Sequence, residues 1–141
     1  MSLIKTPDEI ALLREGGRRL ARAVQETAML VAAGVSIQTL NDHFESLVRQ
    51  GGDTPSFLDY MPRGAKRPFP AAICISVNDE VVHGIPTENP HIIQEGDIVK
   101  LDGGLTHHGL ITDHAVSIIA GKGSEEDEAL VKATKEAMLA G

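Results

Sequence analysis

The sequence predicts an α+β domain in which helices cover one face of an antiparallel sheet. Two segments with helical periodicity come first, a group of strand-like segments follows, and one more helical segment ends the chain. Helices and strands do not alternate, as they would in a doubly wound parallel sheet. With 141 residues, of which 42% are hydrophobic and 23% charged, residues 1–141 have the size and composition of one globular domain or of half a larger one.

The first helix is expected to begin after Thr6 and to extend to Gly34. Thr6 is a favourable N-cap residue, Pro7 suits the first helical position, and Glu9 has the spacing of a capping box. Apolar residues recur at helical spacing through this segment. Gly16-Gly17 interrupts the pattern with two weak helix formers, and we expect a close packing contact there rather than a break.

Two further helices are expected, one after Ser36 and one after Ser124. The second helix ends at Gly51-Gly52, and its His43 is interpreted as a surface or packing residue. Its predicted inner face consists of Leu40, Phe44, Leu47 and Val48. The last helix starts with four consecutive acidic residues, which suit the positive end of the helix dipole. Its predicted inner face consists of Leu130, Ala133, Ala137 and Met138.

The middle of the chain predicts a long loop followed by strands. Residues 51–70 contain four prolines and three glycines, and long ordered loops are often functional. The basic residues of this loop could contact phosphates, although a solvated surface is the commoner role; they are Arg63, Lys66 and Arg67. Strands are expected at 71–77, 80–82, 98–105 and 110–119, with a turn at Asn78-Asp79.

Two aspartates, Asp102 and Asp113, lie in the two arms of the expected hairpin LDGGLTHHGLITDH. A turn centred between His107 and His108 would place these aspartates directly opposite each other, with Cβ atoms about 4.5–5.5 Å apart. Two like charges at this separation destabilise a sheet unless something compensates them. A divalent cation such as Mg²⁺, Mn²⁺, Fe²⁺ or Co²⁺ would do so, and so would a shared proton.

The spacing alone leaves other interpretations open. Asp102 precedes Gly103-Gly104 and could form a turn, and Asp113 could be a surface residue. A retaining glycosidase also needs two carboxyl groups about 5–5.5 Å apart. However, three Phe, one Tyr and no Trp offer little surface for stacking sugar rings. Three nearby histidines are not interpreted as ligands: His107, His108 and His114.

The charge and cysteine content restrict the partners and the compartment. A net charge of -7 argues against general affinity for nucleic acid, and no apolar run approaches the roughly 20 residues that span a bilayer. The single cysteine, Cys74, excludes an intrachain disulfide and fits a reducing compartment. The polar N-terminus is not that of a signal peptide. We therefore expect a cytoplasmic protein without membrane or nucleic-acid partners.

Three segments carry a resemblance to a known family. ICISVNDEVVHGIP (73–86), EGDIVKLDGG (95–104) and GLITDHAVSIIAG (109–121) follow one another as in the methionine aminopeptidases, which belong to the pita-bread metallopeptidases. The N-terminal TPDEIALLREGGRRLARAV also resembles the family's first helix. The resemblance covers nearly all 141 residues but only the first half of the family's length. It implies that residues 1–141 are the N-terminal half of a pita-bread catalytic domain, without the C-terminal half.

The resemblance also implies roles for five residues. Asp102 matches the family's first metal-binding aspartate, and Asp113 matches the second, which bridges two ions. His83 matches the histidine near the scissile bond, which binds substrate and helps to stabilise the transition state. Cys74 and Phe69 fall where residues lining the methionine pocket are expected, although core packing explains them equally well. The cofactors implied are two divalent ions, drawn from Co, Mn, Fe, Zn and Ni.

The activity that the resemblance implies is removal of the initiator methionine from the N-termini of nascent proteins. The family completes its metal shell with a histidine and two glutamates from the second half of the fold, and this chain has no histidine after His114. His114-Ala115 also departs from the Thr-Ser that many bacterial members carry. The chain alone is therefore expected to be inactive, and the missing half or a second copy would have to complete it.

A second hypothesis is a non-catalytic binding module of the same fold. Relatives of this fold have lost catalysis and bind ribosomes, RNA or protein partners instead. Retention of His83, Asp102 and Asp113 argues against this hypothesis, as does the acidic net charge.

Overall fold

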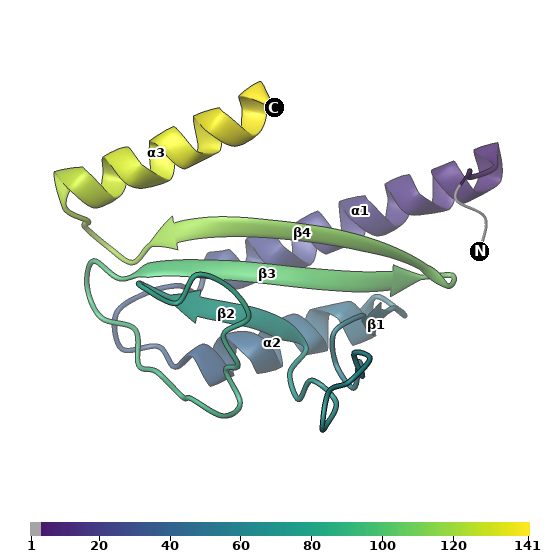
Figure 1. Ribbon diagram of the computed structural model, residues 1–141, viewed down its shortest axis with the longest axis horizontal. Coiled ribbons are helices and arrows are strands. Elements are labelled where there is room, and N and C mark those ends of the chain that lie inside the picture. The colour runs from purple at the N-terminus through teal and green to yellow at the C-terminus, as the bar shows by residue number, and fades with distance from the viewer. Residues whose placement is uncertain (1–3) are drawn as a thin grey trace.

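The computed structural model describes residues 4–141, which form a four-stranded antiparallel sheet and three helices (Figure 1). The elements in chain order are α1 (Pro7–Ala28), α2 (Ile37–Gln50), β1 (Thr54–Pro55), β2 (Ile73–Val77), β3 (Ile98–His107), β4 (Leu110–Ile119) and α3 (Glu125–Ala140). The predicted α+β class is confirmed. No helix among the described residues is long and apolar enough to span a membrane.

The sheet is built around β3, which pairs with each of the other three strands. β4 pairs with β3 along its full length. β2 and β1 share the other edge of β3, where Ile73 pairs with Gly103 and Pro55 with Leu105. β3 therefore carries side chains that β2 and β4 flank from both sides.

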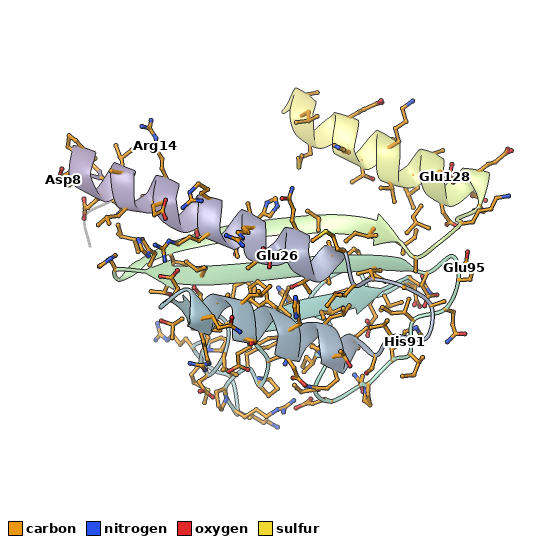
Figure 2. All side chains as sticks on the ribbon, turned by 180° about the vertical axis from the view of Figure 1, so that it is seen from behind. Asp8, Arg14, Glu26, His91, Glu95 and Glu128 are labelled. Atoms are coloured by element: carbon orange, nitrogen blue, oxygen red, sulfur yellow. The ribbon has the colours of Figure 1, made fainter. Side chains whose placement is uncertain are left out.

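Helices α1 and α2 cover one face of this sheet, and the two views agree on this arrangement (Figures 1 and 2). The core between the layers is aliphatic apart from Phe44. Its fully buried members include Leu20, Val24, Leu40, Phe44, Ile73, Ile75, Leu101 and Leu105. Along β3 the odd-numbered residues face this core, and the even-numbered residues from Ile98 to Thr106 are half-buried apart from Gly104, which is buried. The opposite face of the sheet is not covered by a helix.

The start of α1 confirms the sequence prediction, but its end does not. Thr6 and Glu9 form both hydrogen bonds of the capping box. The helix ends at Ala28, six residues before Gly34. The chain then leaves the helix axis because the Gly34 amide donates to the carbonyl of Ile93, and the Ile93 amide donates to the carbonyl of Val35. This long-range pairing could not be read from local periodicity.

Gly16 provides the close packing contact expected in α1. It is buried, and a Cβ atom at this position would lie 3.1 Å from the Cβ atom of His107. The helix axis therefore approaches the end of the β3–β4 hairpin closely, and α1 continues without a break.

Helix α3 begins as predicted but does not bury an inner face. Ser124 caps it, and its first turn is acidic. None of its residues is buried, and Leu130, Met138 and Leu139 are 59%, 69% and 72% exposed. The predicted inner face of Leu130, Ala133, Ala137 and Met138 is thus wrong for this chain alone, because α3 lies beyond β4 rather than over the sheet (Figure 1).

Three strand predictions and one loop prediction also need correction. β2 begins at Ile73 rather than at residue 71, and residues 80–82 form no strand, because Glu80 folds back and accepts a hydrogen bond from the Val77 amide. The predicted loop 51–70 contains the two-residue strand β1. β3 extends to His107, two residues further than predicted.

The loop that leads into β3 is held by the carboxylate of Asp97. This carboxylate accepts hydrogen bonds from the Gln94 amide and the Asn78 side chain, and it contacts His91 Nε2 at 2.8 Å. Figure 2 shows His91 and Glu95 in this loop. Burial alone would raise the pKa of Asp97, but these hydrogen bonds outweigh it and lower the pKa below 3.8. The ionised form is therefore the form that the fold stabilises.

Asp97→Asn is expected to destabilise the chain at neutral pH, by about 1.5–3 kcal/mol if one hydrogen bond to a charged group is lost. Because the folded-state pKa of Asp97 is lowered, its contribution is present above the unfolded-state value and disappears as the pH falls through the folded-state value. Urea unfolding of both proteins from neutral to acidic pH checks this. A stability difference that stays constant as the pH falls through and below the folded-state pKa of Asp97 would contradict it.

Candidate metal centre

The turn of the β3–β4 hairpin lies one residue later than the sequence analysis placed it. His107 pairs with Leu110, so the two turn residues are His108 and Gly109. Both have positive φ, 48° and 77°, as a type I′ turn requires. Glycine is well suited to such a φ, and this fixes the turn at His108-Gly109 rather than at His107-His108.

This turn changes the register but keeps both aspartates on one face. Asp102 pairs with Ala115, and Asp113 pairs with Gly104, so the predicted direct opposition is wrong. The two aspartates are instead diagonal neighbours, for which the expected separation is about 7–8 Å. The pairing has moved by two residues, and side chains alternate with a period of two, so the shared face is preserved. That face is the one without helices.

The acidic pair lies in a graded environment. Asp102 is half-buried and Asp113 is exposed. Burial raises the pKa of Asp102, the charge of Asp113 raises it further, and His83 acts in the opposite direction. The carboxyls therefore interact electrostatically, and a bound cation would remove the repulsion between them.

His83 lies in the segment after β2, with an exposed side chain and a left-handed backbone. Its φ is 60°, which is uncommon for a residue other than glycine. The amide of the next residue, Gly84, donates to Ser76 Oγ on the face of Asp102. The charge of His83 also acts to lower the pKa of Asp102, so the histidine is on the acidic side of the sheet. Three of the predicted site residues, His83, Asp102 and Asp113, thus come together.

Cys74 lies beside the acidic pair, because it is the β2 partner of Asp102. The side chain is buried, with 5% of the residue exposed. Burial, followed by the charges of Asp102 and Asp113, raises the pKa of the Cys74 thiol to about 12. The thiol is therefore protonated at neutral pH.

Alkylation of Cys74 by iodoacetamide at neutral pH is expected to be at least about 100-fold slower than alkylation of the same chain unfolded in urea, because the thiolate is the reactive form. Mass spectrometry against time gives both rates. The variant Asp102→Asn removes one charge that raises the pKa, so it should react faster than the unmodified chain. Equal rates in folded and unfolded chains would contradict the assignment.

Phe69 is linked to the face that carries the acids by a contact with Phe57, a residue that was not predicted from the sequence. The rings of Phe69 and Phe57 meet edge to face, with centroids 6.5 Å apart. Phe57 in turn covers Gly104, where a Cβ atom would lie 2.7 Å from the ring. Because Gly104 is the partner of Asp113, the aromatic pair borders the acids. Phe57 is 47 positions from Gly104, and no local pattern indicates the contact.

The three hairpin histidines lie apart from the acidic pair. His107 is buried on the helix-covered face, where its Nδ1 is 2.7 Å from Oδ1 of Asp53. Arg19 binds the other oxygen of Asp53 at 3.2 Å. His108 is exposed in the turn, and His114 is on the helix side of β4, opposite Gly103. His107 is thus a buried residue at the end of β3, rather than part of the turn in which the sequence placed it.

The basic loop residues and the cavity between the helices also lie apart from the acids. Arg67 forms an ion pair with Glu88 on the surface, and Arg63 and Lys66 are exposed. A cavity of about 350 Å³ lies between α1 and α2 and is lined by residues such as Arg19, Arg22 and Leu47. This cavity is on the helix side of the sheet, so it is not part of the candidate centre.

Comparison with known proteins identifies the family. The model of metallopeptidase family M24 matches residues 11–141. The chain belongs to metallopeptidase family M24. It is 41% identical over 130 residues to a methionine aminopeptidase of Aquifex aeolicus, with 92% of this chain and 50% of the relative covered. It is 36% identical to methionine aminopeptidase 1 of Mycobacterium tuberculosis, with 97% of this chain and 49% of that protein covered.

Solved structures give the same result for the fold. A methionine aminopeptidase from Thermotoga maritima superposes with a TM-score of 0.86 at 34% identity, covering 96% of this chain and 52% of that one. One from Rickettsia prowazekii gives a TM-score of 0.87 at 28% identity, covering 99% and 53%. The chain has the fold of half a pita-bread enzyme and spans about half the length of the M24 relatives that it matches.

The donor set fits the divalent ions that an M24 metallopeptidase implies, but it is incomplete. Asp102 and Asp113 offer carboxylate oxygens on one accessible face, and their mutual repulsion favours a cation. Within residues 4–141, no group of three or more His, Cys, Asp and Glu side chains is arranged to hold a metal ion. Two carboxylates can therefore be part of a metal shell but do not form a complete one.

Proposed function

We propose that residues 1–141 are the N-terminal half of the catalytic domain of a methionine aminopeptidase. The observation that carries the proposal is the placement of the Asp102 and Asp113 carboxylates on one uncovered face of the β3–β4 hairpin. The family match and the methionine aminopeptidase relatives support the same assignment. The reaction is hydrolysis of the first peptide bond of nascent proteins, with release of the initiator methionine.

Each side chain around the acidic pair has a role in this proposal. Asp102 would hold one of two divalent ions and Asp113 would bridge both, the ion being Co, Mn, Fe, Zn or Ni. When bound, such ions lower the pKa of water and polarise a carbonyl group. His83 would hydrogen-bond the substrate near the scissile bond and help to stabilise the developing charge. Cys74 and Phe69, with Phe57, would contact the methionine side chain.

The apolar character of that last group supports its role. Cys74 is protonated and therefore behaves as a small apolar side chain. The ring of Phe57 lies over Gly104, next to the acids, and the ring of Phe69 packs edge to face against it. Sulfur–aromatic contacts favour a methionine side chain beside such rings. A charged substrate side chain would find no partner among these three residues.

The proposal also states what this chain alone does not do. Two carboxylates bind divalent ions weakly, and the remaining ligands would come from the half of the domain that is not part of this chain. We therefore expect that the chain alone releases no methionine. Its expected location is the cytoplasm. Either the missing C-terminal half or a second copy would have to cover the open face, where Ile111 is 61% exposed.

A complementation experiment tests the function. The chain is expressed alone and together with the C-terminal half of the Aquifex aeolicus relative, and methionine release from a Met-Ala-Ser peptide is measured with each candidate metal. We expect release only from the combined halves, and its loss with a chelator. Release by the chain alone would contradict the predicted inactivity. Absence of release from a stably associated pair of halves would contradict the assignment of this chain to the enzyme.

Light scattering at micromolar concentration tests the second-copy alternative. A dimer that Co²⁺ or Mn²⁺ strengthens would favour a second copy at the open face. A strictly monomeric chain with every metal would leave the C-terminal half as the partner.

A further inference from the structure

The segment that carries His83 is attached to the sheet at both ends. At its start, the Asn78 side chain accepts a hydrogen bond from the Ile98 amide at 2.9 Å, and the Asn78 carbonyl accepts one from Lys100 Nζ at 2.6 Å. At its end, the Gly84 carbonyl accepts a hydrogen bond from the Ile75 amide at 3.1 Å. The five residues between these attachments are mostly exposed, yet their ends are fixed to β2 and β3.

Ser76 makes the second bond to Gly84. Its Oγ accepts a hydrogen bond from the Gly84 amide at 3.0 Å, and both partners are buried. Ser76 is two residues from Cys74 on β2, so its side chain points to the face that carries Asp102. The serine hydroxyl therefore holds the chain over the acidic face rather than only along the strand edge.

Gly84 can occupy this place only because it has no side chain. A Cβ atom there would overlap the carbonyl oxygen of Ile75 and would lie 2.8 Å from its carbonyl carbon. The atoms that a Cβ would overlap belong to the backbone of β2, so no side-chain movement can relieve the overlap. The approach of the two chains is thus as close as their backbones allow.

His83, immediately before Gly84, adopts its unfavourable left-handed φ of 60° next to this contact. Such backbone conformations persist where the surrounding structure imposes them, and they cluster at functional sites. Here the imposing contacts are the two hydrogen bonds of Gly84. Within residues 4–141 the exposed His83 ring forms no hydrogen bond that could fix it, so its direction depends on its backbone.

We propose that Ser76 is a positioning residue, which with Gly84 fixes the backbone of His83 so that the imidazole faces Asp102. This inference rests on the role of His83 in the proposed function, but its structural content can be tested without metal or substrate. In this proposal Ser76 contacts neither the metal ions held by the two aspartates nor the scissile bond of the substrate. It acts through the orientation of His83.

The test compares Ser76→Ala with Ser117→Ala in the 141-residue chain by NMR. Ser117 is a matched control, because it pairs with the same Lys100 from the other side and points to the same face, but it is exposed and forms no bond to the His83 segment. Ser76→Ala is expected to accelerate hydrogen exchange at the Gly84 amide about tenfold, as for loss of one hydrogen bond. Ser117→Ala should leave that rate unchanged.

A second readout separates positioning from general stabilisation. The ¹⁵N chemical shifts of the His83 ring are recorded at one alkaline pH in four proteins. These are the unmodified chain, Asp102→Asn, Ser76→Ala and the variant that carries both substitutions. The effect of Asp102→Asn on the ring should become smaller in the Ser76→Ala background. An unchanged effect, or unchanged exchange at Gly84, would overturn the proposal even if methionine release by the combined halves is confirmed.

Gly84→Ala gives an independent variant if Ser76→Ala does not fold. The added methyl group would overlap the Ile75 carbonyl and push the His83 segment away from β2, so the same reduced coupling between His83 and Asp102 is expected. Gly17→Ala is the control, because a Cβ atom there meets only the Thr112 side chain at 3.9 Å, an ordinary van der Waals distance, and α1 lies on the other side of the sheet. Full coupling in folded Gly84→Ala would overturn the proposal.

Discussion

Asp113→Asn is expected to lower methionine release by the combined halves at least about 100-fold, which is the upper end of what outer-shell changes cost a metal site. The carboxylate at this position is exposed on the open face and is the residue proposed to bridge both ions. Asparagine has nearly the same size but is neutral, and it has only one oxygen to offer. Asp102→Asn should have an effect of similar size, because either change leaves one carboxylate on the face.

The measurement is methionine release together with calorimetric titration of Mn²⁺ into the combined halves. Asp42→Asn is the matched control, because it makes the same chemical change on α2, on the other side of the sheet. Its activity and metal affinity should equal those of the unmodified protein. If Asp113→Asn retains both, Asp113 is not a ligand, and the proposed centre is wrong.

The face shared by the acids was predictable from the sequence, whereas their register was not. Alternation along β3 and β4 places Asp102 and Asp113 on one side for any pairing that moves by two residues. The exact pairing depends on the turn, and the signal for it was Gly109, which suits the positive φ of a type I′ turn. A turn placed at His108-Gly109, instead of at His107-His108, predicts the observed register.

Residues that act through long-range packing could not be predicted. Phe57 and Gly104 are far apart in the sequence, and neither shows a pattern that pairs them. Gly103-Gly104 reads locally as a turn, yet both glycines lie in the middle of β3, where their missing side chains admit aromatic rings. The buried Asp53–His107 pair was missed for the same reason.

For helix α3, the sequence predicted the start of the helix correctly but predicted a buried face that this chain does not provide. Its cap and acidic first turn follow from Ser124 and the residues after it. Its large apolar residues Leu130, Met138 and Leu139 are exposed, because the rest of residues 4–141 leaves them uncovered. The sequence indicates that these residues are apolar, but the surface that would bury them lies outside this chain in the proposed function.

Phe44→Ala is expected to cost about 3–5 kcal/mol of folding free energy, a large part of the roughly 5–15 kcal/mol that a typical domain has. Phe44 is fully buried between α2 and the sheet and is among the largest buried side chains. A Cβ atom at Gly103 would lie 2.8 Å from Cζ of its ring, so the ring tip fills the space that this glycine leaves on β3. Truncation would open a cavity between α2 and the strand that carries Asp102.

The same contact predicts a compensation between two substitutions. Gly103→Ala alone should cost about 1–3 kcal/mol, because the added methyl group overlaps the ring. Phe44→Leu removes the ring tip, so the combined variant should be more stable than the sum of the single losses predicts, by about 0.5–3 kcal/mol.

Urea unfolding followed by circular dichroism measures the stability of the unmodified chain, the two single variants and the double variant. Met138→Ala, at a residue that is 69% exposed, is the control and should change stability by no more than about 0.5 kcal/mol. Strict additivity of the two core substitutions would mean that Phe44 does not pack into the gap at Gly103, and the position of α2 against the acid-bearing strand would then need another explanation.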